Sequence, residues 1–186
     1  MKDMALLLVD FQNDYFSSYK GAKFPLDKCE EASLNAAKIL AKFREKKYNI
    51  VHIRHEKDSE NATFFKKDTI GAQIHNNVVP KANEKIITKN FPNSFLYTDL
   101  KEYLDKLGIK KLIIVGAMSH MCIDATVRAA SDLGYDCTVV SDSCATKSLQ
   151  YATVEIPSLF VHATIMAALE FAYSKVINTD KLLEEL

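Results

Sequence analysis

The sequence predicts an α/β fold, a three-layer arrangement in which a mostly parallel sheet lies between two layers of helices. Short runs rich in leucine and β-branched residues alternate along the chain with longer amphipathic stretches. This alternation is typical of parallel strands that are joined by helices and buried on both faces. The chain has 186 residues, 48% of them hydrophobic and 26% charged, so we expect one domain over residues 1–186 with a sizeable core.

The strands are expected where short apolar runs are bounded by polar or turn-forming residues. The first is the run Ala5-Leu6-Leu7-Leu8-Val9, and the fourth ends in Ile113-Ile114-Val115-Gly116. Neither run alternates with polar residues, so both are expected to be buried strands. The six expected strands cover residues 5–10, 49–53, 85–88, 111–116, 136–140 and 175–177.

The helices are expected where apolar residues recur at a spacing of three or four. The first is the best marked, because Asp27 and Glu30 can form a capping box ahead of it. Residues 56–80 form a polar segment that is too long for a plain connector, so we expect a lid or a subunit contact there. The five expected helices cover residues 28–47, 98–107, 121–133, 159–173 and 179–185.

Charge and composition exclude several classes of partner. Lysine plus arginine and aspartate plus glutamate each number 24, so no net field draws the protein to nucleic acid or to a membrane surface. The first apolar run is too short for the core of a signal peptide. The four cysteines include no C-x-x-C pair, and a reduced, cytoplasmic setting is therefore expected.

Three chemically reactive residues follow predicted strands: Asp10, Lys89 and Cys122. The carboxyl ends of parallel strands meet at one edge of a sheet, so the three side chains are expected to converge. Cys122 stands where a helix begins, and the free N–H groups of a first helical turn favour a thiolate.

Together these residues predict nucleophilic catalysis of acyl transfer. Asp10 can take the proton of the Cys122 thiol and later return it to the leaving group or activate a water. Lys89 can keep Asp10 ionised and also lowers the pKa of the thiol. Backbone N–H groups in the turn 116–122 are the expected donors to the oxyanion.

Each residue also has a simpler explanation when taken alone. Cys122 could be a buried structural thiol, which is also what we expect of the other three cysteines. Asp10 could cap a turn, and Lys89 could be a solvated cation. Only their joint placement after three strands favours catalysis. His120 lies in the turn 116–122 and is expected to orient substrate or to pack against its neighbours. His162 is expected to be a core histidine.

A metal site is the alternative that the histidines suggest. A hydrolytic zinc site needs at least three converging ligands and an open position. His52 lies inside a predicted strand, so its side chain and that of His55 would point to opposite faces. His75 is the one plausible distant partner, and we expect no metal and no other cofactor.

Four segments of the chain resemble motifs of the isochorismatase-like cysteine hydrolases, in particular the nicotinamidase-related branch. Residues 7–16 (LLVDFQNDYF) are similar to the aspartate motif of this family, residues 89–95 (KNFPNSF) to its lysine motif and residues 116–130 (GAMSHMCIDATVRAA) to its nucleophile motif. Residues 161–164 (VHAT) resemble a further family segment. The resemblance covers nearly the whole chain.

This resemblance implies a six-stranded, Rossmann-like parallel sheet and a homo-oligomer. It implies that Asp10, Lys89 and Cys122 are a catalytic triad. It also implies a cis peptide bond between Ala117 and Met118, with the N–H groups of Met118 and Cys122 forming the oxyanion hole. The residues it implies for the substrate pocket are Phe16, Phe91, Phe95 and Ser119.

The chain departs from the metal-dependent nicotinamidases of this family, because it reads His52-Ile53-Arg54-His55-Glu56 where they carry an Asp-x-His motif followed by another histidine. We therefore expect a metal-independent hydrolase that cleaves a small amide through a thioester on Cys122. Two alternatives stay open. One is hydrolysis of an isochorismate-like vinyl ether with Asp10 as the acid, and the other is a redox-sensing or binding protein with Cys122 as an oxidisable thiol.

Overall fold

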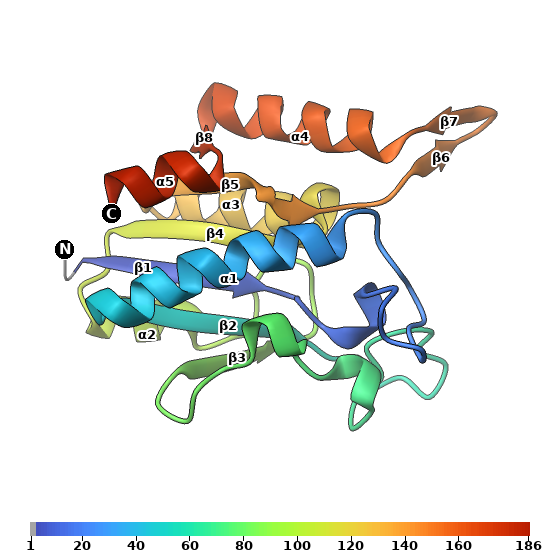
Figure 1. Ribbon diagram of the computed structural model, residues 1–186, viewed down its shortest axis with the longest axis horizontal. Coiled ribbons are helices and arrows are strands. Elements are labelled where there is room, and N and C mark those ends of the chain that lie inside the picture. Colours follow the sequence, from blue (N-terminus) through green and yellow to red (C-terminus); the bar gives the residue numbers. More distant parts are fainter. Residues whose placement is uncertain (1–2) are drawn as a thin grey trace.

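The computed structural model describes residues 3–186 and contains one six-stranded sheet whose neighbouring strands are all parallel. The strand order is β3-β2-β1-β4-β5-β8 (Figure 1). The strands are β1 (Met4–Val9), β2 (Asn49–His55), β3 (Lys85–Lys89), β4 (Lys111–Ala117), β5 (Asp136–Ala145) and β8 (Lys175–Ile177). The prediction of a mostly parallel α/β sheet is confirmed.

Helices cover both faces of this sheet (Figure 1). The central strand β1 alternates between two hydrophobic clusters. Leu6 and Leu8 pack in a cluster with α1 and α5, whereas Leu7 packs in one with α2, α3 and α4. The predicted three layers follow from this alternation. The helices are α1 (Cys29–Lys46), α2 (Leu100–Lys106), α3 (Asp124–Asp132), α4 (Ser158–Ala172) and α5 (Thr179–Glu185).

The predicted capping box at the start of α1 is wrong. Lys28, in a left-handed conformation with φ of 57°, flanks the helix, and no side-chain hydrogen bond caps it. The Glu30 carboxylate instead accepts hydrogen bonds from the hydroxyl of Ser17 and the backbone N–H of Ser18. The capping box does not form because the Glu30 carboxylate is hydrogen-bonded to the loop before the helix.

Other differences lie near the ends of the elements. Strand β2 continues to His55 and β5 to Ala145, both beyond the predicted ends. A hairpin of β6 (Leu149–Tyr151) and β7 (Val154–Ile156) stands in a region where no element was predicted. The predicted helix 121–133 starts with a π-helical turn, Ser119–Ile123, and continues as α3.

A hydrogen bond to Asp14 holds segment 56–80 at the carboxyl edge of the sheet. The buried carboxylate of Asp14 accepts hydrogen bonds from the backbone N–H groups of Phe65, at 2.7 Å, and Lys23, at 3.2 Å. Gly71 passes so close that a β-carbon there would overlap this carboxylate. The segment contains two short 3-10 turns, Ile70–Ala72 and Asn76–Val78.

Within residues 3–186, none of the helices combines the length and the apolar composition that crossing a bilayer requires.

Candidate active site

The site is built around a buried ion pair between Asp10 and Lys89. Asp10 follows β1 directly and Lys89 is the last residue of β3. Lys89 Nζ lies 2.9 Å from Asp10 Oδ2, and both side chains are 0% exposed. The other carboxylate oxygen of Asp10, Oδ1, has no hydrogen-bond partner among residues 3–186. An unpartnered buried acceptor is costly and is typical of a functional position.

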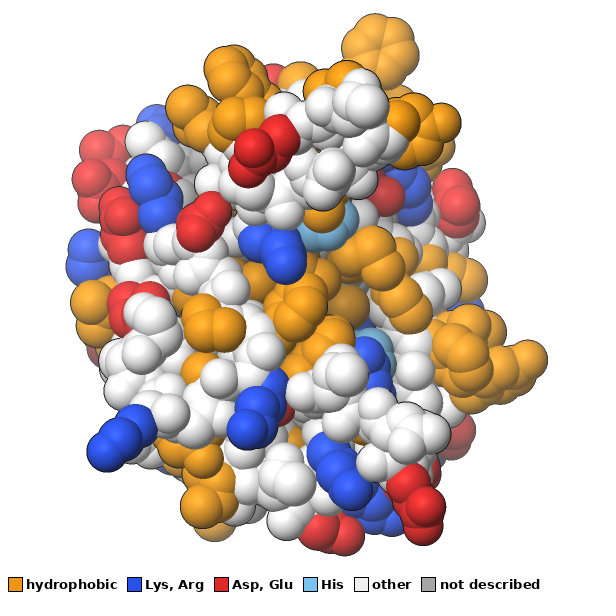
Figure 2. Space-filling model, turned by 90° about the vertical axis from the view of Figure 1, so that its right-hand side faces the viewer, with side chains coloured by type: hydrophobic (Ala, Val, Ile, Leu, Met, Phe, Trp, Pro, Cys, Tyr) orange, Lys and Arg blue, Asp and Glu red, His pale blue; other side chains and the backbone are white. Residues whose placement is uncertain are grey.

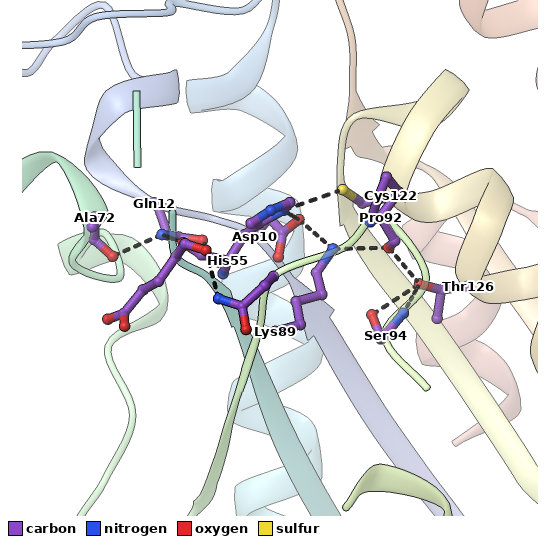
Figure 3. A network of polar contacts seen from close by, with 11 residues as sticks. Asp10, Gln12, His55, Ala72, Lys89, Pro92, Ser94, Cys122 and Thr126 are labelled. Carbon is purple, nitrogen blue, oxygen red and sulfur yellow. Dashed lines mark hydrogen bonds and ion pairs between the residues drawn. The ribbon is translucent and has the colours of Figure 1, made fainter. Parts of the chain in front are cut away.

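Cys122 joins this pair from the turn that follows β4. Its sulfur lies 3.9 Å from His55 Nδ1, and ligand-type atoms of Asp10, His55 and Cys122 all lie within 4.8 Å of one another (Figure 3). The three side chains that the sequence predicted to meet, those of Asp10, Lys89 and Cys122, are thus brought together. Cys122 is 4% exposed, so the nucleophile is buried in the site.

Backbone geometry at the end of β4 sets the position of the reactive turn. Gly116 has φ of +136°, and a β-carbon on it would overlap the backbone of Val9 in the neighbouring strand. Glycine is therefore required for this close approach. The peptide bond between Ala117 and Met118 is cis. The Met118 carbonyl accepts hydrogen bonds from the N–H groups of Met121 and Ile123.

The electrostatics separate the roles of the three groups. Burial would raise the pKa of Asp10, but Lys89 and His55 outweigh it and lower that pKa below its ordinary value. Burial would likewise lower the pKa of Lys89, but Asp10 and the Cys122 sulfur outweigh it and raise that pKa. Asp10 is therefore ionised and Lys89 protonated at neutral pH.

The Cys122 thiol does not have the lowered pKa that its position in the sequence predicted. Burial and then the Asp10 carboxylate raise the pKa of the thiol, and Lys89 offsets this only in part. Burial changes the pKa of the thiol more than the start of the helix does, because a buried thiolate loses its hydration. The resting group is a thiol, and the ionised Asp10 beside it is placed to accept its proton.

His55 is the main site residue that the sequence prediction missed. Its Nδ1 lies 3.7 Å from Asp10 Oδ2, and its pairing partner in β3 is Lys89. The predicted strand stopped at Ile53, so His55 was weighed only as a metal ligand. Continuing the strand by two residues would have placed His55 at the edge that holds the triad.

Gln12 holds this histidine in place and was also missed. Its side-chain Nε2 donates to the backbone carbonyls of His55 and Ala72, and its Oε1 accepts from the His55 N–H, each at 2.7 Å (Figure 3). The loop after β1 is thereby tied to the end of β2.

A second network fixes the loop that follows Lys89. Lys89 Nζ donates to the carbonyl of Pro92 at 2.9 Å. Further along, the hydroxyls of Ser94 and Thr126 lie 2.8 Å apart (Figure 3). Thr126 belongs to α3, the helix that follows the Cys122 turn, so this network connects the loop of the lysine to the helix of the thiol.

The four residues predicted to line the substrate pocket lie in different surroundings. Phe16 is fully buried, with its ring stacked on His75 at 3.7 Å, and Phe95 stacks on Tyr135. Ser119 is also buried, and its hydroxyl donates to the Ala145 carbonyl and contacts His162. Phe91 is 43% exposed. Contact of these residues with substrate stays a prediction.

Among residues 3–186, His52, His55 and His75 do not come together as one set of metal ligands. His52 points away from the thiol and contacts the Glu84 carboxylate at 2.9 Å. The ring of His75 accepts a hydrogen bond from the backbone of Asn77. Asp10, His55 and Cys122 could share an ion, but the Lys89 ammonium already lies 2.9 Å from that carboxylate. Because like charges repel, this residue set does not fit a nicotinamidase-type metal.

Comparisons with known proteins indicate the family to which this chain belongs. A family model described as "Isochorismatase domain" matches residues 4–170. The chain is 44% identical over 180 residues to the uncharacterized isochorismatase family protein YddQ of Bacillus subtilis (strain 168), covering 97% of this chain and 98% of YddQ. It is 51% identical to a putative isochorismatase hydrolase from Oleispira antarctica whose crystal structure superposes with a TM-score of 0.95, covering 98% and 97% of the two chains.

At lower identity, the relatives include Nicotinamidase 3 of Arabidopsis thaliana, 27% identical over 103 residues that cover 55% of this chain and 47% of that protein. The family model spans most of the chain, and the YddQ match spans nearly all of it. This chain therefore belongs to the isochorismatase family of hydrolases.

Proposed function

We propose that this hydrolase cleaves the C–N bond of a small amide through a thioester on Cys122. The observation that supports the proposal most is the meeting of a protonated thiol with an ionised carboxylate in one buried site. A thiol attacks a carbonyl only after losing its proton, and Asp10 is within reach to accept it. A relative named as a nicotinamidase, whose name denotes an amide substrate, supports the choice of an amide.

In the first half-reaction, the Cys122 sulfur bonds to the amide carbon while Asp10 takes the thiol proton. The carbonyl oxygen becomes an oxyanion, for which we assign the backbone N–H groups of Met118 and Cys122 as donors. The C–N bond then breaks, and the nitrogen leaves as ammonia or an amine with the proton from Asp10.

In the second half-reaction, Asp10 takes a proton from water as the water oxygen attacks the thioester. The C–S bond breaks, the acid product leaves, and the proton returns to the sulfur. Lys89 keeps Asp10 ionised between these steps because their charges are paired at 2.9 Å in a buried site. His55 is assigned as a positioning residue, since it touches both the carboxylate and the sulfur.

Trapping the acyl group tests this mechanism. A panel of small amides is screened for ammonia release, and hydroxylamine is then added during turnover of each active amide. The expected result is a hydroxamate product together with an acyl adduct on Cys122 in acid-quenched protein, read by mass spectrometry. Turnover that gives neither a hydroxamate nor an adduct, or a panel without turnover, would contradict the proposal.

A further inference from the structure

Lys57 lies two residues after His55, the histidine that contacts the nucleophile, and it belongs to no part of the triad. The chain stays extended after β2, because the N–H of Glu56 donates to the Lys89 carbonyl and that of Lys57 to the Phe65 carbonyl, each at 2.9 Å. Side chains alternate between the two sides of an extended chain. Arg54 and Glu56 pair with each other at 3.0 Å on one side. His55 and Lys57 therefore project to the other side, where His55 meets Cys122.

A second feature of Lys57 is that its ammonium lacks a counter-ion in the described part of the chain. No carboxylate among residues 3–186 lies within ion-pair distance of its ammonium, which instead sits 3.6 Å from the centroid of the Phe64 ring. The side chain is half-buried, and burial lowers its pKa, whereas the Cys122 sulfur raises it. Lys89 differs, because Asp10 already neutralises it. Lys57 is thus a cation on the same side of the chain as His55, and it has no carboxylate partner among residues 3–186, so it can pair with an incoming anion.

The surface around the site suits a ligand with one charged group and an apolar part. Figure 2 looks onto the carboxyl ends of the strands, where hydrophobic side chains line a hollow and several lysine or arginine side chains lie around it. Near Lys57, the rings of Tyr15, Phe64 and Phe65 pack against one another. A carboxylate close to a partly desolvated ammonium gains a charge-assisted contact.

We propose that Lys57 binds a carboxylate of the substrate, which makes the substrate class small amides that carry an acidic group. The proposal rests on the proposed function for the identity of the reaction, but the binding of an anion beside Cys122 can be tested without turnover.

The test compares two alkylating reagents of nearly equal size, iodoacetate and iodoacetamide, of which only the first is anionic. The rate of Cys122 alkylation by each is measured by peptide mass spectrometry at low salt. Lys57→Gln is expected to lower the ratio of the iodoacetate rate to the iodoacetamide rate about tenfold, the effect of roughly one charge-assisted contact. Lys57→Arg should retain most of the ratio.

Lys66→Gln is the matched control, because Lys66 is a neighbouring exposed lysine whose loss changes the net charge equally. It should leave the ratio unchanged. An equal ratio in the wild type and Lys57→Gln, or failure of both reagents to reach Cys122, would overturn the anion site. A shifted ratio without turnover of any amide would instead contradict the proposed function and leave the anion site standing.

Discussion

Replacing Cys122 with alanine is expected to lower kcat for amide hydrolysis by about 10⁴-fold or more. The variant keeps the Asp10–Lys89 pair but has no atom that can form the thioester, and loss of a covalent nucleophile usually removes most of the catalysed rate. Cys122→Ser should also be severely impaired, because the serine hydroxyl is harder to deprotonate than a thiol. Both effects are measured as ammonia release from the amide that the wild type hydrolyses best.

Cys137→Ala is the control for this experiment. Cys137 is also a buried free thiol, but it lies early in β5 and its sulfur contacts the carbonyl of Tyr135. It should keep activity within a few-fold of the wild type. If Cys122→Ala kept its activity, the thioester route would be excluded. Hydrolysis of a vinyl ether, for which Asp10 would act as an acid and no thiol is needed, would become the better explanation.

Replacing Asp10 with asparagine is expected to destabilise the fold by about 3–5 kcal/mol at pH 7, in addition to removing the base. The cause is that the fully buried Lys89 ammonium loses its counter-ion, and an unpaired buried charge is more costly than a removed pair. The double variant Asp10→Asn with Lys89→Met should recover much of this loss. Urea unfolding at pH 7 gives the free energies of unfolding.

The pH dependence of this effect follows from the direction of the two pKa shifts. Folding lowers the pKa of Asp10. The stability that the ionised carboxylate contributes is therefore present above the ordinary pKa of 3.8, and it is lost as the pH falls through the lower pKa of the folded state. Folding raises the pKa of Lys89. The stability that its ammonium contributes is therefore present below the ordinary pKa of 10.5, and it is lost as the pH rises through the higher pKa of the folded state. The difference between the wild type and Asp10→Asn should therefore be largest between these limits.

An exposed ion pair provides the comparison. Lys101 and Asp105 pair at 2.6 Å with side chains 50% and 53% exposed, and Lys101→Met should cost less than about 1 kcal/mol. If Asp10→Asn changed the unfolding free energy no more than Lys101→Met does, the buried pair would not have the energetic role assigned to it.

The positions of most elements could be predicted from the sequence because they depend on local signals. Apolar runs marked the strands, and the predicted range 175–177 coincides with β8. The placement of Asp10, Lys89 and Cys122 after strands was also enough to predict their convergence, since a parallel sheet brings its carboxyl ends to one edge. The hairpin β6–β7 was missed because its strands have three residues each and mostly exposed side chains.

The sequence by itself thus determined the parallel sheet and the three side chains that meet at its edge, because periodicity and order along the chain are sufficient for both. Only the tertiary structure decided the charge state of Cys122, since burial and a neighbouring carboxylate, not the start of the helix, control its pKa. It also decided the positions of His55 and Gln12. Their placement depends on how far β2 extends and on which loops pack against it, and these are properties of distant contacts that no local pattern records.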